Sequence, residues 1–403
     1  MDPLQNPFSP GAGSPPPKLA GRGPLLEQAR VTLGRVKAGR PERSFLLVGL
    51  RGVGKTVLLN KVRELASGFD YHAVLIEAHE GKPLAALLLP ALRQVLISLD
   101  RMARISQKAK RGLRVLKSFF DGLKLKYHDI AIGIDVDPET GIADSGSLEA
   151  DLAEVFVAVG EAAADRRTAV ALIIDEMQYL NEEELSALIM AMHQISQRQL
   201  PVVLVGAGLP QLAALAGRSK SHAERLFQFP EVGALQPIDA AEAVQEPVQE
   251  QDVRFTEAAL QEIIVQTKGY PYFLQEWGYQ SWNLAARSPI GIDVIHQATR
   301  ESIRRLDANF FRVRFDRLTP REKDYLRALA DLGDTAQRSG DIAERLEVKV
   351  QSIAPVRNGL IKKGMIHSPA HGDTAFTVPL FSDFMKRIMP AKPQIRAIHR
   401  AGT

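Results

Sequence analysis

The residues best suited to chemistry form one short loop, Gly49 to Thr56, which reads Gly-Leu-Arg-Gly-Val-Gly-Lys-Thr. The apolar run 45–48 precedes it and a helix-like stretch follows it, which is the context of a phosphate-binding loop of the G-x-x-x-x-G-K-[ST] type. Phosphate oxygens need several backbone N–H groups that converge on one point, and side chains at the glycine positions would block that approach. The sequence therefore predicts a nucleotide site. The residues expected to contact the nucleotide are Gly49, Gly52, Val53, Gly54, Lys55, Thr56 and Val57.

Lys55 and Thr56 end this loop with two side chains that suit a nucleoside triphosphate. Lys55 adds a point charge toward the β- and γ-phosphates. The Thr56 hydroxyl takes one place around a magnesium ion that otherwise keeps its waters. We therefore expect Mg²⁺ to accompany the nucleotide.

Two acids, Asp175 and Glu176, directly follow the apolar run 169–174. Six apolar residues without alternation predict a strand buried on both faces of a parallel sheet. Asp175 is the expected partner of Mg²⁺ opposite Thr56, and Glu176 is the expected base that orients the attacking water. GTPase-like P-loop proteins usually lack the second acid, whereas it recurs in ATPases of the class with an added strand between the two motifs. The long stretch between the motifs leaves room for such an insertion, so we expect ATP and its hydrolysis.

The composition is that of a globular protein. Of 403 residues, 45% are hydrophobic and 24% are charged, and this length predicts two or three domains. The absence of cysteine excludes disulfides, thiolate zinc clusters and cysteine nucleophiles. No apolar run approaches the ~20 residues that span a bilayer, and residues 1–19 lack the features of a signal peptide, so we expect a cytoplasmic protein with no membrane partner. A formal net charge of +4 permits an acidic partner without requiring one.

Predicted strands and helices alternate over residues 19–236, which predicts a parallel, five-stranded α/β sheet of the P-loop (ASCE) type flanked by helices. Ligands of such sheets bind at the carboxyl ends of the strands, where both motifs lie. Residues 1–18 contain six prolines among small polar residues and are expected to form a disordered lead. The expected strands are 45–48, 72–78, 169–174, 202–205 and 226–229.

Strand signals vanish after residue 236, and residues 237–317 are expected to form an all-α lid. Residues 318–389 show three helices, a two-stranded wing and a closing helix, which is the order of a winged helix. Residues 390–403 are expected to be a flexible tail.

The expected recognition helix of the winged helix is Ser352 to Lys363, with Ser352 as its cap and Pro355 in its first turn. Arginine or asparagine side chains on this helix could read base edges, and lysines could contact phosphate. The alternative is that the winged helix only packs against a neighbouring domain. The residues proposed to contact double-stranded DNA are Arg357, Asn358, Lys362 and Lys363.

Residues 101–128 contain nine Lys or Arg against one acid, Asp121, with apolar residues at helical spacing. This pattern predicts a basic amphipathic helix. A solvated helix face is the first interpretation, a contact with the DNA backbone is the second, and binding at a membrane surface is the third.

From about Lys18 to Met389 the chain resembles AAA+ ATPases of the origin-recognition type and the related signal-transducing ATPases called STAND, most closely over the two ATPase motifs. The resemblance implies that Arg22, in the element Gly21-Arg22, lies beside the adenine. It also implies that Pro271, in Gly269-Tyr270-Pro271, is the lid proline that approaches the base. Arg225 matches the position of an arginine finger, with Arg218 as a substitute, and a finger implies an assembly of several subunits.

Two departures from the family pattern predict slow hydrolysis. The fourth strand ends Val205-Gly206-Ala207-Gly208, with no polar side chain where AAA+ proteins usually place a residue that helps to hold the attacking water. The lid carries Gly269-Tyr270-Pro271 where origin-recognition proteins carry an arginine.

Three functional hypotheses follow from these features. The first is an ATP-driven switch that binds DNA through the winged helix and assembles with nucleotide. The second is a STAND-type regulatory switch that acts on a protein partner without binding DNA. The third is a protein that binds ATP or ADP with negligible turnover.

Overall fold

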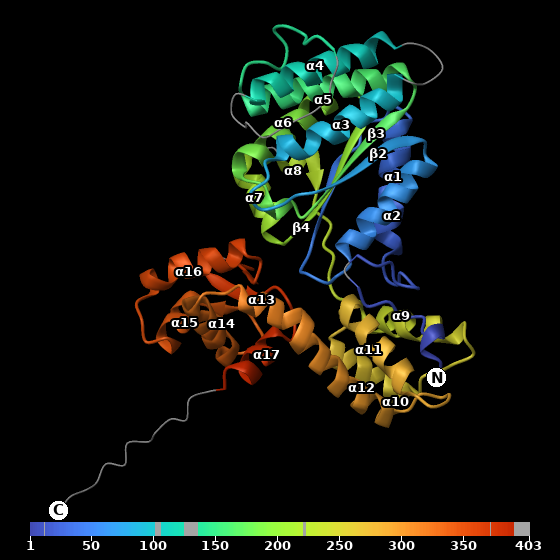
Figure 1. Ribbon diagram of the computed structural model, residues 1–403, viewed down its shortest axis with the longest axis vertical. Helices are drawn as coiled ribbons and strands as arrows, with labels where there is room; N and C mark the ends of the chain where they lie inside the picture. Colours follow the sequence, from blue (N-terminus) through green and yellow to red (C-terminus); the bar gives the residue numbers. More distant parts are fainter. Residues whose placement is uncertain (12, 101–105, 125–135, 221–222, 371, 391–403) are drawn as a thin grey trace, which may run out of the picture. The chain divides into compact units, whose positions relative to one another are not determined.

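The computed structural model describes residues 1–11, 13–100, 106–124, 136–220, 223–370 and 372–390 (Figure 1). Its internal contacts divide the chain into two compact units, 1–298 and 299–403, which are described separately below. The predicted boundary between lid and winged helix, after residue 317, lies inside the second unit, and the boundaries of the predicted domains remain predictions.

The first unit is built on a parallel sheet of five strands in the order β2-β3-β4-β1-β5. β4 lies between β1 and β3, and its register places Gly208 beside Val48 and Gly206 beside Ile174. The carboxyl ends of these strands therefore meet at one edge of the sheet, which confirms the predicted fold class. The strands are β1 (Ser44–Val48), β2 (Tyr71–Glu77), β3 (Ala169–Asp175), β4 (Val202–Gly208) and β5 (Phe227–Gln228).

The strand that separates the two ATPase motifs is β4, which follows both motifs in the sequence. In the described part of the long stretch between the motifs, the chain instead forms β2 and the helices α2, α3, α4 and α5. β1 and β3 are therefore separated in the sheet by β4, and not by a strand from the sequence between the two motifs.

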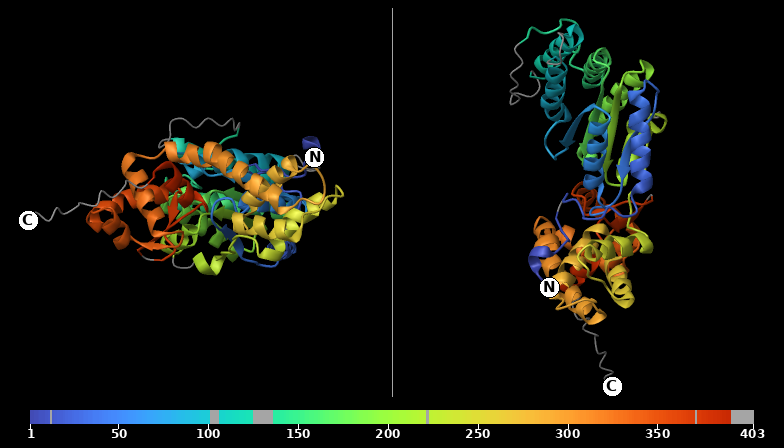
Figure 2. Two further views of the ribbon diagram at one scale, coloured as in Figure 1. Left: turned by 90° about the horizontal axis from the view of Figure 1, so that it is seen from below. Right: turned by 90° about the vertical axis from the view of Figure 1, so that its right-hand side faces the viewer.

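Helices cover both faces of the sheet, as the right-hand view of Figure 2 shows. Successive residues of β1 alternate between two cores: Phe45 and Leu47 face α1 and α2, whereas Leu46 and Val48 face the core of α3 to α6. This alternation is the two-residue period of a strand buried on both sides. The helices are α1 (Gly23–Lys37), α2 (Lys55–Gly68), α3 (Leu84–Asp100), α4 (Gln107–Lys124), α5 (Leu148–Asp165), α6 (Glu182–Gln197), α7 (Gln211–Ser219) and α8 (Ala223–Leu226).

The basic amphipathic helix is α4, and four of its cations pair with acids of the same unit: Lys108, Arg111, Arg114 and Lys117. Lys108 Nζ lies 2.7 Å from a Glu161 carboxylate oxygen, and Arg114 Nε lies 2.7 Å from one of Glu139. These ion pairs favour the first interpretation of the charge run, a solvated helix face. Residues 130–136, whose partial alternation predicts a further strand or hairpin arm, lie almost wholly outside the described residues.

Four helices follow the sheet: α9 (Pro237–Gln249), α10 (Glu257–Thr267), α11 (Pro271–Leu284) and α12 (Ile292–Arg305). α12 crosses the division between the two units. Among the described residues, no helix has the length and apolar character needed to cross a bilayer.

The proline-rich lead is expected to be disordered, but the structure shows it packed along α11. Phe8 is only 3% exposed, and a Cβ on Gly278 would come within 2.6 Å of its ring. Trp282 Nε1 donates to the carbonyl of Asp2 (2.8 Å), and Asn6 Nδ2 donates to that of Tyr279 (3.0 Å). One buried aromatic ring thus anchors a segment whose composition alone indicates a random chain.

The second unit contains a small antiparallel sheet in the order β6-β8-β7, together with helices that come in the order expected of a winged helix. Its core is aromatic: the ring centroid of Phe311 lies 5.5 Å from that of Phe381 and 5.3 Å from that of Phe384. The elements are the π-helical turn η3 (Leu306–Phe311), α13 (Arg312–Asp316), α14 (Pro320–Leu332), β6 (Gln337–Arg338), α15 (Ser339–Arg345), α16 (Val350–Lys362), β7 (Ile366–His367), β8 (Asp373–Phe376) and α17 (Phe381–Ile388).

The start of α16 corrects the predicted recognition helix. The helix begins at Val350 with Lys349 as its cap, so Ser352 is not the cap and Pro355 lies inside the helix. The reason is that the Ser352 hydroxyl donates back to the carbonyl of Lys349 (2.7 Å) instead of accepting from a backbone N–H further along.

Candidate nucleotide site

The loop after β1 has the backbone of a phosphate cradle at the start of α2. Gly52 and Gly54 have φ angles of 82° and 92°, a left-handed conformation that favours glycine. A Cβ on Gly49 would lie 2.1 Å from the carbonyl oxygen of Val232, so no other residue fits there without a backbone shift. The glycines predicted from the motif are therefore required by the geometry.

Lys55 is buried in this loop. Its ammonium donates to the carbonyls of Gly49 (2.8 Å) and Leu50 (2.9 Å), and the residue is 8% exposed. Burial lowers the pKa of Lys55 to about 8, although the charges of Glu176 and Asp175 act in the opposite direction. A buried cation inside a cradle of glycines fits an anionic ligand such as a triphosphate.

Thr56 and Asp175 are brought into direct contact. The Thr56 hydroxyl donates to Asp175 Oδ2 (2.6 Å), and the backbone N–H of Glu176 donates to Oδ1 (2.8 Å). Burial raises the pKa of Asp175, and these two hydrogen bonds lower it. One hydroxyl and one carboxylate at the edge of a phosphate cradle suit Mg²⁺, which keeps several waters and is shared with phosphates.

Glu176 stands beside this pair in an unusual backbone conformation. Its φ of 54° is left-handed, which costs a residue with a side chain about 1 to 3 kcal/mol. Glu176 precedes a 3₁₀ turn, η2 (Met177–Tyr179), whose Gln178 donates to the Glu176 carboxylate. Tyr179 accepts a hydrogen bond from Arg51 of the phosphate loop (3.2 Å). The sequence does not single out Gln178, because its contact with Glu176 follows from the fold of η2 and not from a local pattern.

Arg22 and Pro271 lie at the edge of the phosphate loop. Arg22, 7% exposed, donates to the carbonyls of Val53 (3.1 Å) and Gly233 (2.6 Å), and burial lowers its pKa. Tyr272, directly after Pro271, donates its N–H to the carbonyl of Gly52 (3.3 Å). The structure thus brings both predicted residues to the loop, while contact with the adenine remains a prediction.

The N-terminal lead also reaches the site, which the sequence did not indicate. A Cβ on Gly13 would lie 3.4 Å from the methyl group of Thr56. Further along, Lys18 pairs with Glu242 (2.8 Å) and Glu246 (2.6 Å) of α9. The lead therefore passes from α11 over the start of α2 to α9.

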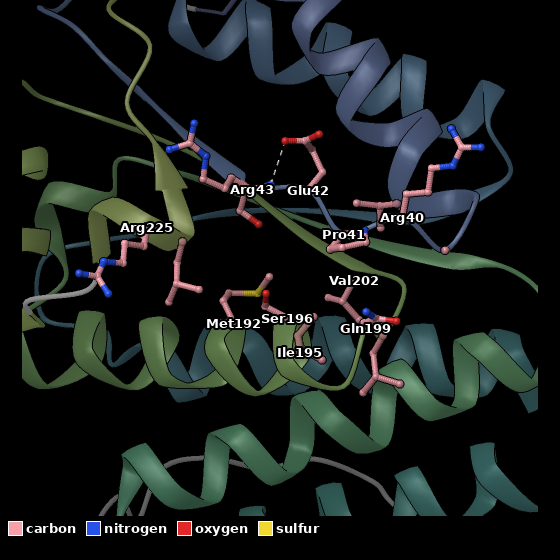
Figure 3. A pocket seen from close by; sticks show the side chains of 15 residues that line it. Arg40, Pro41, Glu42, Arg43, Met192, Ile195, Ser196, Gln199, Val202 and Arg225 are labelled. Carbon is pink, nitrogen blue, oxygen red and sulfur yellow. Dashed lines mark hydrogen bonds between the residues drawn. The ribbon is translucent and has the colours of Figure 1, made fainter.

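Arg225 lies at the opposite edge of the sheet from the phosphate loop. It belongs to α8, and β5 directly after it pairs with the first residues of β1. Arg225 lines a cavity of about 200 Å³ at the amino ends of β1 and β4. Arg40 and Arg43 line the same cavity (Figure 3). Arg225 therefore cannot reach the nucleotide site of its own chain. Arg218, the other candidate for the arginine finger, forms an ion pair with Glu182, with 3.4 Å between Nε and Oε1.

The proposed DNA-binding residues divide into two pairs. Arg357 donates to Thr374 (2.9 Å) and to the carbonyl of Asp373 (2.8 Å), so it ties α16 to the wing. Lys363 pairs with Glu322 (2.7 Å). Asn358 and Lys362 are exposed on α16.

Comparisons with known proteins agree with this geometry. Residues 18–205 match the family model of an AAA ATPase domain, and residues 308–385 match a domain of unknown function, DUF8462. A comparison with curated proteins found no significant match.

Two solved structures share the fold over most of the chain. A Walker-type ATPase of Pyrococcus abyssi aligns with a TM-score of 0.55 and 15% identity, over 91% of this chain and 96% of that one. The ORC2 protein of Aeropyrum pernix, in ADPNP and ADP complexes, aligns with a TM-score of 0.51 and 16% identity, over 95% and 98% of the two chains.

Proposed function

The chain carries a P-loop ATPase domain of the AAA+ superfamily, and from this premise we propose that it is a magnesium-dependent, ATP-hydrolysing molecular switch. The observation that carries the proposal is the cluster of Thr56, Asp175 and Glu176 at the mouth of the glycine cradle. Thr56 and Asp175 would hold Mg²⁺, and Lys55 would bind the β- and γ-phosphates. Glu176 orients a water for attack on the γ-phosphorus and accepts its proton, as the bond to ADP breaks.

The test is ATP turnover by the full chain and by Glu176→Gln, with Mg²⁺ and with EDTA. The amide keeps the shape of the carboxylate but cannot accept the proton, so we expect kcat to fall about 100-fold or more. The affinity for ATP should stay within about threefold, because the phosphate contacts are unchanged. EDTA should abolish turnover. Equal and measurable phosphate release by both proteins would refute the role of Glu176, and negligible release by both would leave the third hypothesis, nucleotide binding with negligible turnover.

The output of the switch is proposed to be binding of double-stranded DNA by α16 of the winged helix, supported by the exposed Asn358 and Lys362. Because Arg357 is tied to the wing, the double variant Asn358→Ala/Lys362→Ala is the cleaner test. We expect weaker duplex binding and a salt slope reduced by about 1, measured by fluorescence anisotropy between 50 and 200 mM salt. Lys386→Ala on α17 makes the same change in charge and is the control. Equal slopes for the two variants would remove α16 from DNA binding.

A second output is favoured by the internal bonds of Arg357 and Lys363, which leave fewer cations for DNA. In this alternative the protein is a STAND-type switch whose C-terminal unit acts on a protein partner. It predicts tight retention of nucleotide and no mobility shift with duplex DNA at low salt.

The position of Arg225 supports a proposed homo-oligomer that assembles with nucleotide. Since Arg225 and the phosphate loop lie at opposite edges of one sheet, a finger at this position would act on a neighbouring copy. Native mass with ADP and with a non-hydrolysable ATP analogue tests for this assembly.

A further inference from the structure

Gln178 uses both ends of its side-chain amide. Its Nε2 donates to the Glu176 carboxylate, and its Oε1 accepts the backbone N–H of Leu209 (3.1 Å), directly after β4. The amide therefore links the water-orienting acid to the end of the neighbouring strand. One hydrogen bond joins Gln178 to the side chain of Glu176, and the other joins it to the backbone at the end of β4.

The glycines at the end of β4 make room for this link. A Cβ on Gly208 would lie 3.1 Å from Gln178 Oε1, and a Cβ on Gly206 would lie 2.1 Å from Met177 Sδ. Real Cβ contacts are seldom that short, so a side chain at either position would force the side chain of Gln178 or Met177 to shift. The space beside the end of β4, which carries no polar side chain, is thus occupied by Met177 and Gln178 of η2.

We propose that Gln178 is a positioning residue for ATP hydrolysis, which supplies from η2 the polar group that β4 lacks. A carboxylate on a two-bond stem has several rotamers, and a general base must lie within hydrogen-bond reach of the water that it orients. The amide N–H fixes one Glu176 oxygen and leaves the other free to accept from water. The bond to Leu209 prevents the amide from rotating away. This inference rests on the proposed hydrolysis at Glu176.

The experiment compares steady-state ATP turnover, affinity for a non-hydrolysable ATP analogue, and thermal midpoint in three variants of the full chain. Gln178→Leu removes both hydrogen bonds. Gln178→Glu keeps the length and the acceptor for Leu209 but cannot donate to Glu176 as a carboxylate. Gln197→Leu, on an exposed part of α6, repeats the apolar substitution away from the site.

We expect Gln178→Leu and Gln178→Glu each to lower kcat about 10- to 100-fold, as displaced supporting residues typically do. Nucleotide affinity and thermal midpoint should stay close to those of Gln197→Leu. A purely structural role, through Leu209 alone, predicts instead that Gln178→Glu retains the parent kcat, and that result would overturn the proposal.

Two other results separate this inference from the proposed function. If Glu176→Gln loses turnover while Gln178→Leu stays within about threefold of the parent, hydrolysis stands and the role of Gln178 is refuted. If the parent and Glu176→Gln are equally inert, the proposed hydrolysis fails and the inference fails with it.

Discussion

Lys55 makes the stability of the nucleotide-free protein depend on pH in a way that can be measured. Burial lowers its pKa from 10.5 to about 8, and at about 1.4 kcal/mol per pKa unit this corresponds to about 3 kcal/mol. Below pH 8 the ammonium is charged in both the folded and the unfolded state, so folding bears the full cost of burying the charge. Between pH 8 and 10.5 the unfolded state keeps a proton that the folded state has lost, so stability rises with pH.

The perturbation is Lys55→Met, which keeps the length of the side chain and removes the charge. Without nucleotide, the variant should exceed the parent in free energy of unfolding at pH 7.5. That advantage should shrink by about 3 kcal/mol on going to pH 10.5. Trp277 and Trp282 are the only tryptophans of the chain and lie in the same unit as Lys55, so their emission in urea titrations with EDTA reports the unfolding of this unit.

The control is Lys61→Met on α2, which makes the same substitution at a lysine that is paired with Glu64 near the surface. A difference between Lys55→Met and the parent that stays constant from pH 7.5 to 10.5 would refute the reasoning. It would mean that the Lys55 ammonium is as well solvated by the loop carbonyls as by water.

Three further predictions test the loop, the lead and the assembly. Gly49→Ala should weaken ATP binding about tenfold or more in an equilibrium titration, since its Cβ would meet a backbone carbonyl, whereas Gly68→Ala on α2, with open space around it, should not. Phe8→Ala should release the lead at a cost of about 2 to 3 kcal/mol, seen as a red shift of tryptophan emission and faster proteolysis of residues 1–18; an unchanged spectrum would contradict the docking. Arg225→Ala mixed in equal amount with Glu176→Gln should regain about a quarter of parental turnover if each site is shared between two copies, and a mixture no faster than the separate variants would exclude a finger at this position.

The site could be predicted from the sequence wherever one local pattern carries the chemistry. The phosphate loop and the Asp175-Glu176 pair each lie at a strand end, and the order of a parallel sheet is enough to bring them together. That Pro271 approaches the base is implied only by the family resemblance, and the contact of its neighbour Tyr272 with the carbonyl of Gly52 is not indicated by the sequence.

Gln178, Arg357 and Phe8 show what the sequence could not predict. The role of Gln178 depends on the end of β4, which lies next to it only after folding. Arg357, which the sequence predicts to contact DNA, instead donates a hydrogen bond to the wing. The ring of Phe8 packs against Gly278, which lies far from it in the sequence. In each case a tertiary contact, rather than a propensity or a period, decides where the side chain goes.

The docking of the lead on α11 has a consequence for biosynthesis. Ser9 and its partner Gln275 are 266 residues apart in the chain, and Asp2 and Trp282 are 280 apart. At about 5 to 20 residues per second, the lead leaves the ribosome roughly 10 to 50 s before α11 exists. During that interval a segment rich in apolar residues would find other partners, whereas one rich in proline, with a single phenylalanine, stays solvated. The composition that makes residues 1–18 look like a disordered lead is therefore suited to a segment that must wait for the last helices of its unit.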